Sequence, residues 1–143
     1  MVIILRYAVD GILWKNNKVI LIKRAGRTFH GFWALPGGIL EEGETVEETL
    51  TREMKEEVNM DVKPLAILGV YSHPERDPRE HTISVVFICN YDGNPSAGDD
   101  AADWQEFLLD ELGNIEIAFD HKKILSDLKK WLTKRETFWS SKI

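Results

Sequence analysis

The sequence contains a single cysteine, Cys89, among 143 residues. One cysteine excludes an intramolecular disulfide and any cysteine-rich zinc site, and it fits a reducing compartment such as the cytoplasm. No uncharged stretch approaches the roughly 18 residues of a membrane span, and Arg6 and Asp10 interrupt the apolar N-terminus too early for a signal peptide. We therefore expect a cytoplasmic location and no membrane partner.

Positive charge is also scarce, because 18 Lys and Arg residues face 24 Asp and Glu residues, which gives a net charge of −6. This balance disfavours a protein that grips nucleic acid over a broad surface. It leaves room for a small phosphorylated ligand, since a bound cation can mediate that contact. The length, the 43% hydrophobic content and the lack of repeats or long linkers predict one globular domain over residues 1–143.

The pattern of apolar residues predicts both strands and helices. β-Branched and aromatic residues indicate strands at 2–14, 18–23, 62–70, 82–91 and about 105–109. A helix is expected over 45–58, where Thr45 and Glu48 form a capping box. A last helix is expected after Asp120, which can cap it. The class is therefore α+β.

Acidic residues crowd the first expected helix and the segment before it. Glu53, Glu56 and Glu57 stand at positions i, i+3 and i+4, so their carboxylates gather on one side of the helix. Like charges at this spacing repel each other, and clustered carboxylate oxygens are what Mg²⁺ or Mn²⁺ prefers. Spacing alone leaves a metal site and a solvated acidic face both open.

The segment Trp33-Ala34-Leu35-Pro36-Gly37-Gly38 lies just upstream. Pro36 cannot donate a hydrogen bond to a strand and is expected to end one, and the two glycines permit backbone conformations that other residues resist. Placed directly before a carboxylate-bearing helix, such a loop can bring a bare carbonyl against a cation.

Together these residues resemble the Nudix box of hydrolases that act on nucleoside diphosphates linked to another group. Eight of the nine specified positions of the 23-residue box match, and they are Gly38, Glu44, Arg52, Glu53, Met54, Glu56, Glu57 and Met60. The departure is Asn59, where the family has glycine. A glycine after a helix usually adopts the left-handed conformation, and Asn is the next-best residue there.

The resemblance implies an α/β/α sandwich around a mixed sheet, with the box as a loop, a helix and a loop. It implies that Glu53, Glu56 and Glu57 bind Mg²⁺ (or Mn²⁺ in its place) together with the Gly37 carbonyl. It also implies that Arg52 pairs with Glu44 and holds the carboxylates in place. The base that removes the proton of water stays open between a box glutamate, Glu53 or Glu56, and an acidic residue outside the box; the outside candidates are Asp100, Asp99 and Glu80.

Three short segments, 77–81, 98–101 and 118–121, look like the ADP-ribose pyrophosphatase branch of the family. That likeness implies hydrolysis of ADP-ribose to AMP and ribose 5-phosphate. The candidate substrate contacts are Arg79, Asp99, Phe32 and Trp33, and a homodimer is compatible with the sequence. The alternatives are hydrolysis of nucleoside triphosphates such as oxidised dGTP, or of dinucleoside polyphosphates. A non-catalytic sensor of ADP-ribose-like ligands is disfavoured, because all three metal-binding glutamates are present.

Overall fold

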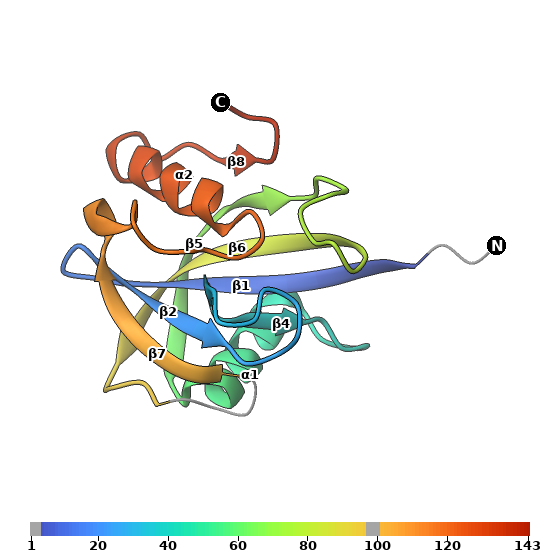
Figure 1. Cartoon of the computed structure of the whole chain (residues 1–143), viewed down its shortest axis with the longest axis horizontal. Coiled ribbons are helices and arrows are strands. Elements are labelled where there is room, and N and C mark those ends of the chain that lie inside the picture. The colour runs from blue at the N-terminus through green and yellow to red at the C-terminus, as the bar shows by residue number, and fades with distance from the viewer. Residues whose placement is uncertain (1–3, 97–100) are drawn as a thin grey trace.

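The computed structural model describes residues 4–96 and 101–143. The elements follow one another along the chain (Figure 1) as β1 (Leu5–Lys15), β2 (Lys18–Arg24), β3 (Trp33–Ala34), β4 (Gly37–Ile39), α1 (Val46–Val58), β5 (Asp61–Tyr71), β6 (His81–Asp92), β7 (Ala101–Leu108), a short 3₁₀ turn (Leu109–Glu111), α2 (His121–Thr133) and β8 (Phe138–Trp139). Strands surround α1 and precede α2, so the expected α+β class is confirmed.

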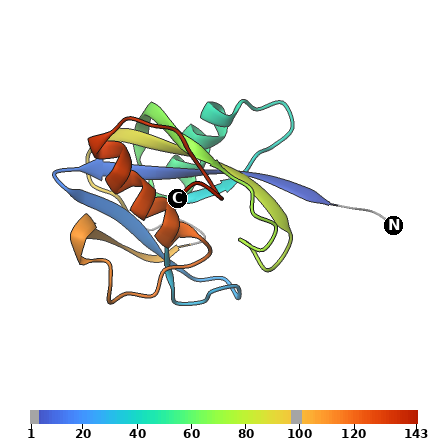
Figure 2. The same ribbon diagram turned by 90° about the horizontal axis from the view of Figure 1, so that it is seen from above.

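The strands form a mixed sheet in the order β3-β2-β1-β6-β5-β8, with β4 also paired to β1 and β7 to β2. The long strands β1 and β6 run parallel, in a register that extends from Leu5 opposite His81 to Leu13 opposite Cys89. The pairs β1–β2, β2–β7 and β5–β6 are antiparallel. The two helices lie on opposite sides of the strands in both views (Figures 1 and 2).

Alternating side chains of the central strands build two separate cores. Ile20 and Ile22 of β2 pack in the core that contains Leu50 and Met54 of α1. Their neighbours Val19 and Leu21 pack in the other core, which contains residues of α2, namely Ile124, Leu125 and Leu128. Because successive strand residues point to opposite faces, a strand buried on both faces reads as a continuous apolar run. The expected α/β/α sandwich is thus confirmed.

The ends of α1 follow the local sequence signals. Thr45 Oγ1 accepts from the Glu48 N–H at 3.1 Å, and the Glu48 carboxylate accepts from the Thr45 N–H at 2.9 Å, which is the predicted capping box. Asn59 ends the helix at φ 55° and ψ 40°, the predicted left-handed conformation. Its N–H donates to the Lys55 carbonyl at 3.1 Å. A side chain with little steric cost in this conformation therefore replaces the glycine of the box.

Several elements differ from the expectation. The last strand before α2 is longer than predicted, since β7 begins at Ala101 and pairs along the whole of β2. The strand that Pro36 was expected to end is present as β3, but the sequence did not predict β4 or β8. Gly37 and Gly38 belong to β4 rather than to a loop, and they pair with Asp10 and Val9 of β1. Asp120 precedes α2 but makes no side-chain cap, because its carboxylate binds an arginine instead.

Candidate active site

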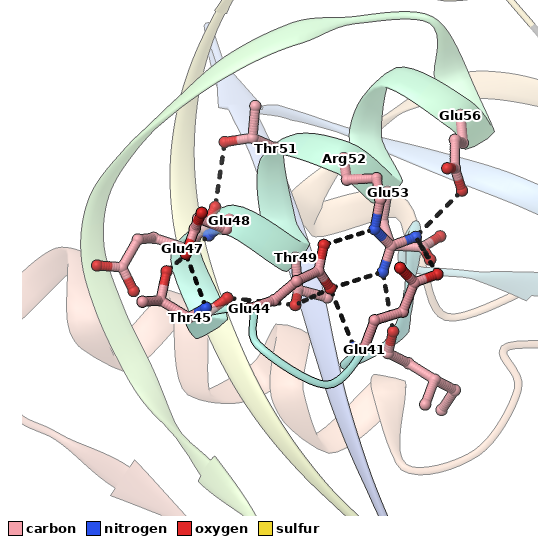
Figure 3. A network of polar contacts seen from close by, with 11 residues as sticks. Glu41, Glu44, Thr45, Glu47, Glu48, Thr49, Thr51, Arg52, Glu53 and Glu56 are labelled. Atoms are coloured by element: carbon pink, nitrogen blue, oxygen red, sulfur yellow. Dashed lines mark hydrogen bonds and ion pairs between the residues drawn. The ribbon is translucent and has the colours of Figure 1, made fainter.

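A single guanidinium group organises the acidic cluster at α1 (Figure 3). Arg52 Nε donates to Glu44 Oε2 at 2.7 Å and Arg52 Nη2 to Glu44 Oε1 at 3.0 Å, which makes a bidentate pair. Arg52 Nη1 also reaches Glu53 Oε1 at 2.7 Å and Glu56 Oε2 at 3.2 Å. The arginine therefore stands between the carboxylates and offsets their mutual repulsion.

This pairing changes the acidity of Glu44. Hydrogen bonds from the Arg52 side chain, and then from the Glu41 backbone, lower the pKa of Glu44 from 4.5 to about 2. The same Glu44 carboxylate accepts from the Thr49 hydroxyl at 2.9 Å, so it joins the loop before α1 to the helix. Glu44 thus stays ionised at neutral pH and holds Arg52 in place.

The strand β4 lies directly against this cluster. A Cβ built on Gly38 would overlap the Glu53 carboxylate, and one built on Gly37 would overlap Asp10 and the Val9 backbone. Neither glycine has a positive φ. The requirement for glycine here is therefore close approach, not an unusual backbone conformation, which corrects the reason inferred from the sequence.

The donors at this place are oxygens of carboxylates and of backbone carbonyls, which suit a hard divalent cation. Glu53 lies against Gly38, and Glu57 and Gly37 line one common cavity. In the described ranges no group of three or more acidic, histidine or cysteine side chains is already arranged to hold an ion. The Arg52 hydrogen bonds to Glu53 and Glu56 explain this, since they turn two of the carboxylates toward the guanidinium. The residue types fit a divalent cation, and the carboxylates would have to turn toward it.

A cavity of about 320 Å³ adjoins the acidic cluster. One part of its lining consists of Gly37, Gly38 and Glu57. Another part is basic and comes from four arginines on three separate parts of the chain, namely Arg6, Arg24, Arg76 and Arg79. The volume is within the range of small-molecule sites. The cavity therefore joins an acidic surface to a set of guanidinium donors.

Two of these arginines lie against one aromatic ring. The guanidinium carbons of Arg24 and Arg79 are 4.8 and 5.4 Å from the centroid of the Phe119 ring. Phe119 has φ 55° and contacts Phe29, at φ 52°, edge to face with 4.9 Å between centroids. Positive φ at bulky residues is a strained conformation that persists only where the surroundings impose it, and such residues cluster at functional sites.

Carboxylates hold the guanidinium groups of Arg76 and Arg79 in the cavity lining. Arg76 makes a buried bidentate pair with Asp120, at 2.9 and 2.7 Å. Arg79 pairs with Asp77 at 3.0 and 2.8 Å. Burial alone would raise the pKa of the Asp77 carboxyl, but the hydrogen bonds from Arg79 outweigh it and leave that pKa below its usual range. The guanidinium groups are thus fixed in direction before any ligand binds.

The structure distributes the sequence-predicted site residues unequally. Arg79 lines the cavity, and its role as a substrate contact stays a prediction. Phe32 packs against the core beneath α1 and contacts Phe29, with 5.3 Å between ring centroids. Trp33 packs against Phe107 in the other core, and within the described ranges it is not part of the cavity lining. Asp99 and Asp100 lie outside the described residues, so their predicted roles stay predictions.

Sequence reasoning missed several other cavity residues. Arg24 ends β2, and nothing in its local sequence distinguishes it from other surface arginines. Phe119 and His121 lie in the segment 118–121, which carried a signal through its resemblance to one branch of the family. His121 is buried, and its Nδ1 accepts from the Leu35 N–H at 3.0 Å.

Comparison with known proteins identifies the class. A sequence model of the NUDIX domain matches residues 4–128, which is most of the chain. The chain is also 52% identical over 125 residues to the ADP-ribose pyrophosphatase of Methanocaldococcus jannaschii, covering 87% of this chain and 73% of that protein. The protein therefore belongs to the Nudix family and is a Nudix hydrolase. Nudix hydrolases generally use divalent metal ions.

Two further relatives bear on the substrate. The 8-oxo-dGTP diphosphatase of Proteus vulgaris is 35% identical over 88 residues, which cover 61% of this chain and 78% of that protein. A bifunctional NMN adenylyltransferase/ADP-ribose pyrophosphatase of Francisella tularensis, crystallised with AMP and a manganese ion, superposes with a TM-score of 0.78 at 27% identity. That alignment covers 90% of this chain and 42% of the other.

Among the described elements, no helix is both long and apolar enough to cross a membrane.

Proposed function

We propose that this protein hydrolyses ADP-ribose to AMP and ribose 5-phosphate with the help of Mg²⁺, for which Mn²⁺ can substitute. The observation that carries the proposal is the cavity in which Glu57 of the acidic cluster and four arginines meet. A diphosphate between two riboses offers oxygens to both parts of such a lining. The 52% identity to the Methanocaldococcus enzyme supports the choice of ADP-ribose.

Glu53, Glu56, Glu57 and the Gly37 carbonyl would hold the cation. When bound, it would neutralise the diphosphate charge and polarise the phosphorus–oxygen bonds. The bond that breaks is one P–O bond of the anhydride, and the oxygen of water forms the new bond to phosphorus. Arg52 orients the carboxylates through its bonds to Glu53 and Glu56.

The proton of that water passes to a carboxylate. The candidates stay those of the sequence: Glu53 or Glu56 within the box, and Asp100 with Asp99 or Glu80 outside it. Glu53 is constrained by the Arg52 hydrogen bond at 2.7 Å, whereas the Glu56 side chain is 55% exposed and held by a longer bond of 3.2 Å. A carboxylate that must accept a proton needs freedom to reach it, which favours Glu56 over Glu53 as the box candidate.

The arginine part of the cavity would bind the rest of the substrate. A guanidinium group offers a rigid fork of donors that matches phosphate oxygens and vicinal ribose hydroxyls. Arg79 is fixed by Asp77 yet lines the cavity. Phe119 supplies an apolar surface in the same lining. These contacts lie outside the acidic cluster, so they would determine which substrate binds rather than how fast it reacts.

A second candidate is hydrolysis of an oxidised nucleoside triphosphate, favoured by the match to the Proteus vulgaris 8-oxo-dGTP diphosphatase. The two activities differ in their products. Cleavage of ADP-ribose releases AMP and a sugar phosphate, while cleavage of 8-oxo-dGTP to the monophosphate releases inorganic pyrophosphate.

The test is a hydrolysis panel with Mg²⁺, in which ADP-ribose, 8-oxo-dGTP, diadenosine polyphosphates and NADH are compared by kcat/KM and products are identified. We expect ADP-ribose to give the highest kcat/KM and AMP as product. A preference for 8-oxo-dGTP with release of pyrophosphate would overturn the substrate assignment. Glu57→Gln keeps the shape but removes a charged ligand, and it should lower turnover by orders of magnitude. Near-wild-type turnover in that variant would overturn the metal assignment.

The same proposal extends to location and assembly. Cys89 is buried, and burial raises the pKa of its thiol to about 12, so little thiolate forms at neutral pH. A single buried thiol is compatible with action in the cytoplasm.

Trp139 is 48% exposed and is our candidate contact for a homodimer. Sedimentation of the wild-type and Trp139→Ala proteins would test this contact.

A further inference from the structure

A buried histidine joins α2 to the segment that precedes the metal site. His121 is the first residue of α2 and is only 3% exposed. Its Nδ1 atom accepts the Leu35 N–H at 3.0 Å, a contact between residues 86 positions apart. Leu35 comes two residues before Gly37, whose carbonyl is a proposed cation ligand.

The protonation state of this histidine makes it an acceptor. Burial is the largest influence and lowers the pKa of His121, so the ring is neutral at physiological pH. Because Nδ1 accepts from Leu35, the single ring proton resides on Nε2, which faces Asp10 Oδ2 at 3.9 Å. Asp10 is in turn fixed by the Ser84 hydroxyl, which donates to Oδ2 at 2.5 Å.

Different elements of the fold hold consecutive backbone groups of residues 35–37. His121 binds the N–H of Leu35, and the Gly11 N–H donates to the Pro36 carbonyl at 2.9 Å. Gly37 itself pairs with Asp10 in the sheet, so closely that a Cβ would overlap that side chain. A peptide fixed at each successive residue has little freedom to rotate, so the direction of its carbonyls is determined.

We propose that His121 is a positioning residue of the metal site, which acts through the Leu35 N–H to orient the Pro36–Gly37 backbone and hence the Gly37 carbonyl. The proposal rests on the proposed function in that Gly37 is taken as a cation ligand. His121 touches no reacting atom. It connects the segment 118–121, which carries Phe119 of the substrate cavity, to the oxygen that would meet the cation.

The competing explanation is that His121 only anchors α2. The two explanations differ in which substitution restores function. An asparagine places its amide oxygen close to the position of Nδ1, so His121→Asn keeps an acceptor for Leu35. A glutamine places its oxygen nearer to the position of Nε2, and a leucine offers no acceptor. A merely structural role would not discriminate between the two amides in metal affinity.

The experiment measures Mn²⁺ binding to the full chain by electron paramagnetic resonance, without substrate. Loss of a residue that orients a ligand typically weakens metal binding 10–100-fold, so we expect about tenfold weaker binding in His121→Leu and His121→Gln, and less than about threefold in His121→Asn. The glutamine and asparagine variants keep the comparison decisive should the leucine variant fail to fold.

Tyr71→Phe is the matched control. It removes a different buried hydrogen bond of α2, the one that the Tyr71 hydroxyl donates to Asp127 Oδ2 at 2.8 Å, and this bond involves no residue of the segment 35–38. We expect it to lower the unfolding midpoint but to leave Mn²⁺ affinity unchanged. Equal Mn²⁺ affinity in the asparagine, glutamine and leucine variants, or an equal loss in Tyr71→Phe, would overturn the proposal. Wild-type protein that binds Mn²⁺ but fails to cleave ADP-ribose would instead overturn the proposed substrate alone.

Discussion

Alanine at the two adjacent glycines of β4 should have opposite consequences for folding and for the metal site. A Cβ on Gly38 meets the carboxylate of Glu53, which is the far end of a flexible side chain. A Cβ on Gly37 meets the Val9 carbonyl and the Asp10 backbone, which are fixed in the sheet. The first clash can be relieved by rotation of one side chain, and the second requires movement of a strand.

The expected changes in stability follow from the atoms that each new Cβ would meet. Neither glycine has a positive φ, so alanine restricts the unfolded chain without backbone strain and contributes about 0.4–1 kcal/mol of stability at either position. In Gly38→Ala this gain offsets part of the weakening of the partly buried pair between Glu53 and Arg52, and Arg52 keeps its bidentate pair with Glu44. In Gly37→Ala the same gain in stability is smaller than the cost of overpacking, which is about 1–3 kcal/mol and more where the backbone cannot move.

Urea unfolding in EDTA measures the change in stability. Mn²⁺ affinity and kcat/KM measure the change at the metal site. We expect Gly38→Ala to unfold within about 1 kcal/mol of the wild type but to lose metal affinity and turnover, because its Glu53 carboxylate is displaced. Gly37→Ala should lose stability outright. Gly113→Ala is the control, since its Cβ would meet no atom within 4 Å. The reasoning fails if both β4 variants lose equal stability, or if Gly38→Ala keeps full turnover.

Substitutions at three other positions test single contacts. Because Arg52 lowers the pKa of Glu44 to about 2, the pair stabilises the fold fully above pH 4.5 and progressively less as the pH falls toward 2; acid unfolding of Glu44→Gln should lack this dependence. Asn59→Gly should be neutral or slightly stabilising, whereas Asn59→Val should cost about 1 kcal/mol or more in thermal unfolding, and equal stability would exclude the left-handed cap. Arg79→Ala should raise KM for ADP-ribose with little change in kcat, and a fall in kcat alone would contradict its binding role.

The first helix was predictable because its signals are local. Thr45 and Glu48 lie three residues apart, and Asn59 adopts its conformation through bonds to the preceding turn. Such features depend on neighbours in sequence, so a pattern read along the chain contains the necessary information. The pairing of Arg52 with Glu44, eight residues apart, is equally local and is present as the family resemblance implies.

The strand β4 was not predictable in the same way. Gly37 and Gly38 read as a turn, but they pair with β1 because Asp10 and Val9 arrive beside them from 27 or more residues away along the chain. The role of Phe119 likewise depends on Arg24, which is far away in sequence and lies against the Phe119 ring in the fold. Strand pairing and burial between distant parts of the chain determine the structure at these positions, and neither produces a periodic pattern of residues in the sequence.

The charges of the cavity explain how an acidic protein can select an anionic substrate. Arg76 and Arg79 each have a carboxylate partner, Asp120 and Asp77, so these pairs add directed donors to the lining but little net positive charge. The acidic cluster repels a diphosphate, and paired arginines offer little electrostatic attraction of their own. Binding of a diphosphate would therefore depend on the cation, while the fixed guanidinium groups discriminate among diphosphates by geometry. Under this division, removal of the metal should weaken the binding of every substrate alike, whereas loss of one arginine should weaken the binding of some substrates more than that of others.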